Sequence, residues 1–213
     1  PLPSGRMKPL VALTIATIFT IAGIVILYAI NPKCALFGAI SIFLYTSVYT
    51  PLKAVTPLAV FVGAIPGAIP FMLGWVAATG QFGIEAGFLF MIQFFWQFQH
   101  FWAFGWLQFE EYNKAGLHML PMDKKDKGAI VQMIFYTCVM ILVSVAPVLK
   151  VSSKLYIFPV TAAVVAVLGG LMLYYAIQLY KSHQNTDARK LMLASVFYIT
   201  VVPIIYVIDK FLH

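Results

Sequence analysis

The sequence predicts an all-α protein, a polytopic bundle of about seven transmembrane helices. Of its 213 residues, 62% are hydrophobic and only 10% are charged. The mean hydropathy is +0.92, and no soluble globular domain of this size tolerates such a composition. Apolar runs, most of them with about the twenty residues needed to cross a bilayer, alternate with polar turns. The runs cover residues 9–30, 34–50, 57–78, 86–108, 128–149, 156–180 and 191–211.

Each predicted span is separated from the next by residues that end helices. The second run is short, which fits a helix whose end opens into a cavity. No linker is long enough to divide the chain, so we expect one transmembrane domain over residues 1–213. The chain opens on a loop sequence, PLPSGR, without the features of a signal peptide, and we expect it to be an N-terminally truncated fragment. The separators include Asn31-Pro32, Thr50-Pro51, Thr56-Pro57, Thr79-Gly80 and Pro121.

The third span is rich in glycine and proline. Small residues let helices approach closely, and proline frees backbone carbonyl groups inside the membrane. The span therefore forms either a tight packing surface or a kinked wall beside a groove for a lipid-like substrate. The residues concerned are Gly63, Pro66, Gly67, Pro70 and Gly74.

A polar stripe runs down the fourth span. At about 100° per residue from Gln93, Gln97 falls at about 40°, His100 at about −20° and Glu111 at about 0°. Unpaired polar groups are costly in hydrocarbon. We therefore expect this face to line the functional site, and the helix phase favours Glu111 over Glu110 as its carboxylate if the helix persists that far.

Basic residues predict the orientation. Ten lie on one set of alternate loops and four on the other, so the first set is expected to be cytoplasmic. The formal charge of +7 could suggest nucleic acid or anionic lipid as a partner, but in a membrane protein the placement of charge is more informative than its sum, and no nucleic-acid partner is expected. The ten are Arg6, Lys8, Lys53, Lys114, Lys124, Lys125, Lys127, Lys181, Arg189 and Lys190, and the four are Lys33, Lys150, Lys154 and Lys210.

Four acidic residues share the single loop 109–127 with several lysines. Carboxylates at a membrane surface suit Mg²⁺, which is usually held by one or two carboxylates together with substrate phosphates. Lysine and arginine take further phosphate charge. A Phe-rich cavity behind such a site would hold a hydrocarbon tail, so the pattern is compatible with a prenyl diphosphate. Cys34 and Cys138 have no metal-type spacing and are interpreted as packing residues.

His100 has two interpretations. A histidine in an aromatic helix is commonly hydrogen-bonded within the bundle, but neutral imidazole is also the common axial ligand of haem iron. Its place on the polar face favours a functional role. His118, His183 and His213 are interpreted as solvated.

Three long motifs resemble one family. YTPLKAVTP (49–57), VGAIPGAIPFMLGWVAATG (62–80) and HFWAFGWLQFEEYNKAGLHMLP (100–121) closely resemble the protohaem IX farnesyltransferase (haem O synthase) family of UbiA-type intramembrane prenyltransferases. The resemblance extends over essentially the whole chain, with PLPSGR similar to the segment that follows the family's first acidic motif. It implies a bundle of nine helices in the full family fold, with two spans and that first motif upstream of Pro1.

The resemblance also implies an activity in haem biosynthesis. Farnesyl diphosphate would be joined to the vinyl group of protohaem IX, with a hydroxyl from water, to give haem O and diphosphate. The implied cofactor is Mg²⁺, haem being substrate, and the implied location is the inner (cytoplasmic) cell membrane with the motif loops facing the cytoplasm. Haem A synthase and terminal-oxidase assembly proteins are potential partners. A chain without the first motif is expected to be inactive alone.

Site residues follow from the same resemblance. Tyr49 and Lys53, which share a helix face at i, i+4, match a Tyr-x-x-x-Lys element assigned to the diphosphate. The expected catalytic residues are Lys53, Glu111 and Tyr112, with Glu111 where the family commonly has Asp. Substrate binding is expected from Arg6, Tyr49, Gln93, Gln97, His100, Trp102 and Lys114, and metal binding through diphosphate from Glu111 and Glu110.

Two other functions compete with this one. A transporter would also have a polar stripe and kinked helices, but it requires polar residues through the whole bilayer depth. The spans after residue 128 are nearly devoid of them. A non-catalytic haem-binding assembly protein would keep His100 and show haem spectra without product.

Overall fold

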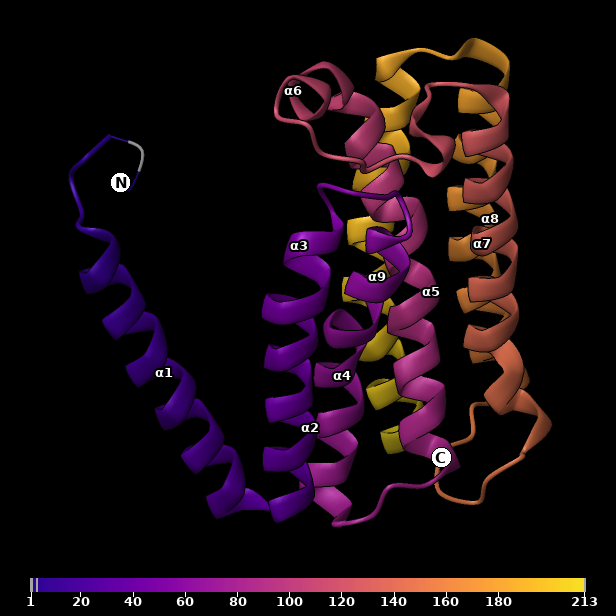
Figure 1. Ribbon diagram of the computed structural model, residues 1–213. Helices are drawn as coiled ribbons and strands as arrows, with labels where there is room; N and C mark the ends of the chain where they lie inside the picture. The colour runs from indigo at the N-terminus through magenta and orange to yellow at the C-terminus, as the bar shows by residue number, and fades with distance from the viewer. Residues whose placement is uncertain (1, 3, 213) are drawn as a thin grey trace.

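The computed structural model describes residues 2 and 4–212, and the part it describes is helical without strands. The elements are α1 (Pro9–Ile30), α2 (Pro32–Phe43), the π-helical turn η1 (Leu44–Tyr49), α3 (Thr50–Leu52), α4 (Ala59–Thr79), α5 (Ile84–Leu107), α6 (Phe109–Lys114), η2 (Pro121–Asp123), α7 (Lys127–Val145), η3 (Ala146–Leu149), α8 (Pro159–Ser182) and α9 (Asn185–Leu212) (Figure 1).

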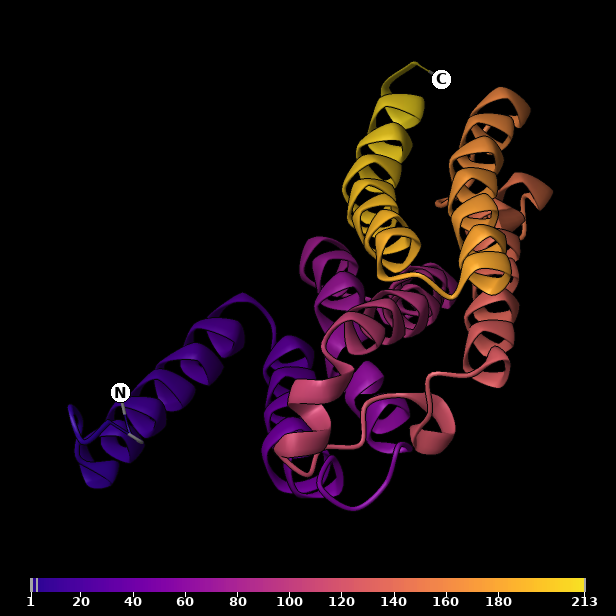
Figure 2. The same cartoon turned by 90° about the horizontal axis from the view of Figure 1, so that it is seen from above.

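Helix α5 lies at the centre of the bundle. It packs against α4, α7 and α9, while α2 packs on the far side of α4. Helix α1 contacts α2 and otherwise stands apart, as the view from above makes clear (Figure 2). None of the residues of α1 is buried. The element that carries the predicted polar face is therefore the one with the most helical neighbours.

Each of the seven predicted spans corresponds to a long helical segment. Within the described residues, six are long and apolar enough to cross a membrane, which makes the chain a multi-pass membrane protein. The second is longer than predicted, Pro32–Leu52, because η1 and α3 continue α2. Helix α5 falls outside the six, since glutamine and histidine side chains interrupt its apolar sequence.

Several of the predicted separators end helices where expected, but Thr50-Pro51 does not, because the second span continues through it to Leu52. The side chain of Asn31 accepts a hydrogen bond from the backbone N–H of Lys33 at 2.8 Å and caps α2. Gly80 ends α4 with a φ of 68°, a left-handed conformation that glycine adopts without strain. The side chain of Asp126 caps α7 by accepting from the N–H of Ala129 at 2.8 Å.

Proline in α4 frees a carbonyl group that another helix satisfies. Pro70 has no N–H, so the carbonyl of Pro66, four residues earlier, lacks its usual helical donor. The hydroxyl of Ser41 on α2 donates to that carbonyl at 3.1 Å. The close packing of α2 against α4, one of the two alternatives for this span, therefore occurs at these prolines.

The last three spans were expected to be nearly devoid of polar residues, and several of the few that they carry are buried. Ser144, Tyr198, Tyr206 and Asp209 are buried on α7 and α9. The Tyr206 hydroxyl donates to the Ser144 carbonyl, and the Asp209 carboxylate accepts from the Thr161 hydroxyl at the start of α8. The bonds of Tyr206 and Asp209 brace the bundle, whereas the hydroxyls of Ser144 and Tyr198 have no hydrogen-bond partner among the described residues. The argument against a transporter therefore has to rest on other observations.

The predicted division of basic residues appears at the two ends of the bundle. The segment before α1, the end of α3, α6 and the loop that joins α8 to α9 all lie at one end (Figure 1). The α1–α2 turn, the α4–α5 loop and the C-terminus lie at the other. The segments 49–57 and 109–121 of the resembling motifs thus lie at the end that is richer in lysine and arginine.

Candidate functional site

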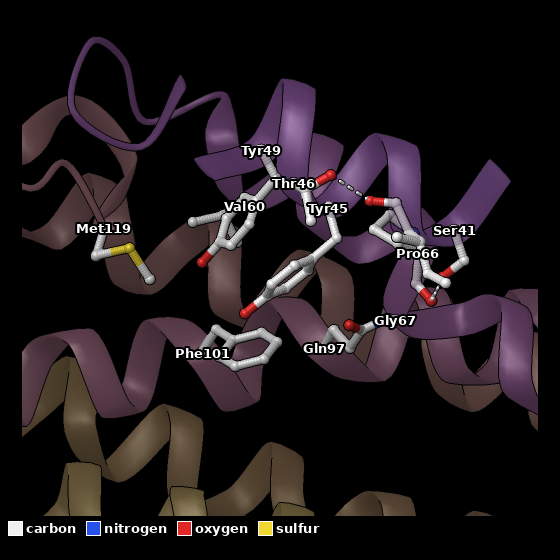
Figure 3. Close-up of a pocket in the computed structure, with 12 residues that line it drawn as sticks. Ser41, Tyr45, Thr46, Tyr49, Val60, Pro66, Gly67, Gln97, Phe101 and Met119 are labelled. Atoms are coloured by element: carbon white, nitrogen blue, oxygen red, sulfur yellow. Dashed lines mark hydrogen bonds between the residues drawn. The ribbon is translucent and has the colours of Figure 1, made fainter. Parts of the chain in front are cut away.

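A cavity of about 370 Å³ lies between α2, η1, α4 and α5. This volume falls in the range of about 300–1,000 Å³ typical of small-molecule sites. The lining is mostly apolar and carries a few hydroxyl and amide groups. It comprises Ser41, Ile42, Tyr45, Thr46, Tyr49, Val60, Gly63, Pro66, Gly67, Gln97, Phe101 and Met119 (Figure 3).

Two glycines one turn apart form the α4 wall. A Cβ at Gly63 would lie 2.7 Å from Cδ2 of Tyr49, and a Cβ at Gly67 would lie 2.0 Å from Oε1 of Gln97. Real Cβ atoms do not approach other atoms so closely. The absence of a side chain at both positions is therefore what lets Tyr49 and Gln97 face the cavity.

The opposite wall is formed by the π-helical turn η1. Tyr45 and Tyr49 both point from it toward α5 (Figure 3), with ring centroids 5.2 Å apart. The wider turn shifts the helix phase by one residue, and π-helical turns are frequent at functional sites. The hydroxyl of Thr50 donates to the Tyr45 carbonyl at 2.8 Å. The prediction that the second span ends beside a cavity is confirmed.

Tyr49 lines the cavity, and Lys53, which does not line it, lies beside Tyr49. The end of the cavity at this pair is called its mouth. The Lys53 Nζ atom is 5.8 Å from the centroid of the Tyr49 ring, so the predicted shared face is confirmed. The Lys53 carbonyl accepts from the backbone N–H of His118 at 2.9 Å, which ties the end of α3 to the loop after α6. Tyr112 is near enough to Tyr49 to interact with it electrostatically. Burial raises the pKa of the Tyr112 hydroxyl, which therefore stays protonated and able to donate at neutral pH.

Gln97 presents an amide oxygen to the cavity. Its Nε2 atom donates to the carbonyl of Ala64 at 2.9 Å and to that of Gln93 at 3.2 Å. Oε1 must then point the other way, toward Gly67. The side chain of Gln93 does not line this cavity, and its own Oε1 is buried without a partner. The two glutamines of the predicted stripe thus have different environments.

His100 turns toward α9 on the neighbouring side of α5. Its Nδ1 lies 2.8 Å from the hydroxyl of Ser195, and its ring stacks on that of Trp96 with centroids 4.7 Å apart. The Trp96 Nε1 atom donates to the Ser195 carbonyl at 2.6 Å. The predicted hydrogen bond of His100 within the bundle is therefore confirmed, and it uses Nδ1, while the role as a haem ligand stays a prediction.

Comparison with known proteins identifies the family to which this architecture belongs. Residues 1–201 match the UbiA prenyltransferase family. The chain belongs to the UbiA prenyltransferase family. It is 62% identical to a protohaem IX farnesyltransferase of Christiangramia forsetii and 60% identical to one of Flavobacterium psychrophilum, over 100% of this chain and 71% of each relative.

A solved structure supports the fold of this UbiA prenyltransferase. The chain of a digeranylgeranylglyceryl phosphate synthase superposes with a TM-score of 0.79 at 20% sequence identity. The match covers 98% of this chain and 72% of the other. The seven long helices therefore follow a known prenyltransferase arrangement.

The prediction that the polar stripe continues beyond Leu107 in this UbiA member is wrong. Helix α5 ends there, because Gln108 has a φ of −101° and a ψ of 18°, and α6 starts in a new direction. Glu111 is therefore not in phase with Gln93. It is 69% exposed and pairs with Lys114 at 2.9 Å. Glu110 is also exposed, so the helix phase no longer distinguishes the two carboxylates.

Two other predicted residues of the UbiA prenyltransferase lie outside this cavity. Trp102 lines a second cavity of about 330 Å³, an aromatic one between α4, α5 and α7. Arg6 is exposed in the segment before α1, which Figure 1 shows away from the bundle. The structure does not bring these two together with Tyr49 and Lys53.

Sequence reasoning missed several lining residues of the UbiA prenyltransferase. Tyr45 precedes Tyr49 by four residues, so the helix-face argument applied to Lys53 could have found it. Met119 had no such signal, because it lies in a loop. His118, interpreted as solvated, is partly buried and its Nδ1 lies 2.7 Å from a carboxylate oxygen of Asp123.

Proposed function

We propose that this prenyltransferase transfers the farnesyl group of farnesyl diphosphate to a vinyl group of protohaem IX and so makes haem O. The carrying observation is the 62% identity over the whole chain to a relative named protohaem IX farnesyltransferase. The cavity supports it, since its lining is mostly apolar and Tyr49, which lines it, lies beside the basic side chain of Lys53. The fold alone would fit other prenyl acceptors.

The two parts of the donor substrate, the farnesyl chain and the diphosphate, would contact different residues. Val60, Phe101 and Met119 offer an apolar surface for the farnesyl chain. Lys53 would neutralise the diphosphate at the mouth, and the protonated hydroxyls of Tyr49 and Tyr112 would donate hydrogen bonds to its oxygens. Lys114 and Arg6 remain proposed phosphate contacts at the periphery, and Lys114 would have to leave Glu111 to make one.

The acidic residues fit a shared Mg²⁺ better than one held by the protein alone. No group of three or more His, Cys, Asp or Glu side chains suited to a metal occurs in the described part of the chain. Mg²⁺ commonly uses one or two carboxylates plus substrate phosphates, and Glu110 and Glu111 are accessible for that role. When bound, the ion supplies charge neutralisation to the departing diphosphate.

The protein would act by binding, orienting and excluding water. Lys53 and the two tyrosines would hold the diphosphate while the bond between its oxygen and the first farnesyl carbon breaks. The electron pair of the haem vinyl group then forms the new carbon–carbon bond to the allylic cation. Water adds to the cation left beside the porphyrin and loses a proton, giving the hydroxyl. Apolar cavity walls would keep water from the allylic cation before that bond forms.

Placement in the cell follows from the same proposal. The end rich in basic residues would face the cytoplasm in the inner membrane. Residues 1–213 would form one prenyltransferase domain. Haem A synthase and terminal-oxidase assembly proteins are proposed partners, since they would receive or use the product.

Membranes containing the full-length protein test the proposal directly. They are incubated with haem B, farnesyl diphosphate and Mg²⁺, and haem O is followed by chromatography and mass. The Christiangramia forsetii relative is the positive control. We expect haem O from both, strongly reduced by Lys53→Met and unchanged by Lys150→Met at the other end of the bundle. Haem O from the relative alone would contradict the proposed function.

A further inference from the structure

The hydrogen bonds around Ser195 define the protonation of His100. The Ser195 hydroxyl lies 2.6 Å from the Met192 carbonyl. A carbonyl can only accept, so the single hydroxyl hydrogen of Ser195 points to Met192. The Ser195 oxygen can then only accept from His100, 2.8 Å away, and Nδ1 must carry a hydrogen.

The remaining ring nitrogen is open. His100 Nε2 has no partner among the described residues, and it is not among their enclosed polar atoms. In the Nδ1–H tautomer this nitrogen carries a free lone pair. The ring is fixed in place, since Trp96 stacks on it and donates to the Ser195 carbonyl. His100 does not line the cavity itself, although Phe101, the next residue, does.

We propose that Ser195 is a positioning residue that holds His100 in the Nδ1–H tautomer, so that Nε2 ligates the iron of the haem substrate. This inference rests on the proposed function, because it takes haem as the acceptor. The chemistry is that of haem and metal sites in general, where neutral imidazole binds through one nitrogen and a hydrogen bond to the other orients the ring. A histidine that only packs would have no need of an open nitrogen.

The tautomer can be measured without haem or activity. The full chain, labelled with ¹⁵N-histidine, is studied by NMR in nanodiscs, and His100→Gln identifies the His100 signals. We expect a protonated Nδ1 and an unprotonated Nε2. Ser195→Ala should raise the Nε2–H population severalfold, while Ser195→Thr, which keeps the hydroxyl, restores the native pattern. Ser144→Ala, which removes another buried hydroxyl, is the control and should change nothing. A native Nε2–H tautomer would overturn the proposal.

Haem ligation is tested by absorption spectra of bound haem B. His100→Gly should lose the imidazole-ligated spectrum, and added free imidazole should restore it. Ser195→Ala should weaken haem binding by about tenfold. A ligated spectrum that survives in His100→Gly would overturn the ligation. Absence of haem binding by the unsubstituted chain would do so too, and the separate haem O assay would then show whether the proposed function fails with it.

Discussion

Replacing Gly67 by alanine should displace the side-chain amide of Gln97. The new Cβ would lie 2.0 Å from Oε1 and 2.9 Å from Cδ of that side chain. The end of a glutamine is flexible, so the contact could be relieved by a change of rotamer. That movement would cost the bonds from Nε2 to the Ala64 and Gln93 carbonyls, which are 2.9 and 3.2 Å long.

The expected loss can be worked from those two bonds. Hydrogen bonds between membrane helices contribute on average about 0.6 kcal/mol each, and a buried donor left unpaired costs about 1–3 kcal/mol. We therefore expect Gly67→Ala to lower the free energy of unfolding by about 1–3 kcal/mol. Gly74→Ala on the same helix is the matched control, because no atom lies within 4 Å of its added Cβ. It should be neutral or stabilising, as alanine favours helices.

Unfolding in detergent, followed by tryptophan fluorescence, measures both variants. The double variant Gly67→Ala, Gln97→Ala has no amide to displace, so its loss should be smaller than the sum of the two single losses by about 1 kcal/mol. Equal stability of Gly67→Ala and Gly74→Ala would refute the reasoning. Strict additivity in the double variant would also show that the two positions do not interact.

Three further changes test the mouth of the cavity and one helix cap. Gly63→Ala should push the Tyr49 ring away and lower kcat for farnesyl transfer by about tenfold or more, with Gly74→Ala unchanged; an unaltered kcat would mean that the ring position is unimportant. Lys53→Met should raise KM for farnesyl diphosphate by about tenfold at low salt, whereas Lys150→Met should not, and equal KM values would remove Lys53 from the diphosphate site. Asp126→Ala should lose the cap of α7 and lower the free energy of unfolding by about 1 kcal/mol; thermal unfolding should show Asp126→Asn to be closer to the native protein, and a similar loss in both would argue against the cap.

The sequence predicted those features of the fold that depend only on residues close together in the chain. Hydrophobic length and the separators Asn31-Pro32 and Thr79-Gly80 located helix ends, because those residues act on their own turn of backbone. The Tyr49–Lys53 pair followed from helix geometry alone. In each case the physical cause lies within about four residues.

Features that depend on distant partners could not be predicted. Ser195 lies 95 residues from His100, and no local pattern connects them. The break at Gln108 has no proline beside it, the nearest glycine, Gly105, is still within α5, and the residues that follow continue as α6. Extending one helix phase through that point placed Glu111 on the wrong face. The π-helical turn similarly has no signature in the residues Leu44 to Tyr49.

The low hydropathy of α5 has a consequence for how the protein is made. A segment that carries Gln93, Gln97 and His100 partitions into a bilayer less readily than its neighbours. We therefore expect it to need contacts with other helices during insertion. The partner of Gln97 on α4 has already been synthesised, but the partner of His100 on α9 emerges from the ribosome 95 residues later. Until α9 is synthesised, the His100 imidazole must lie in lipid, in water or against an insertion factor. The central helix is therefore expected to be among the last to reach its final environment.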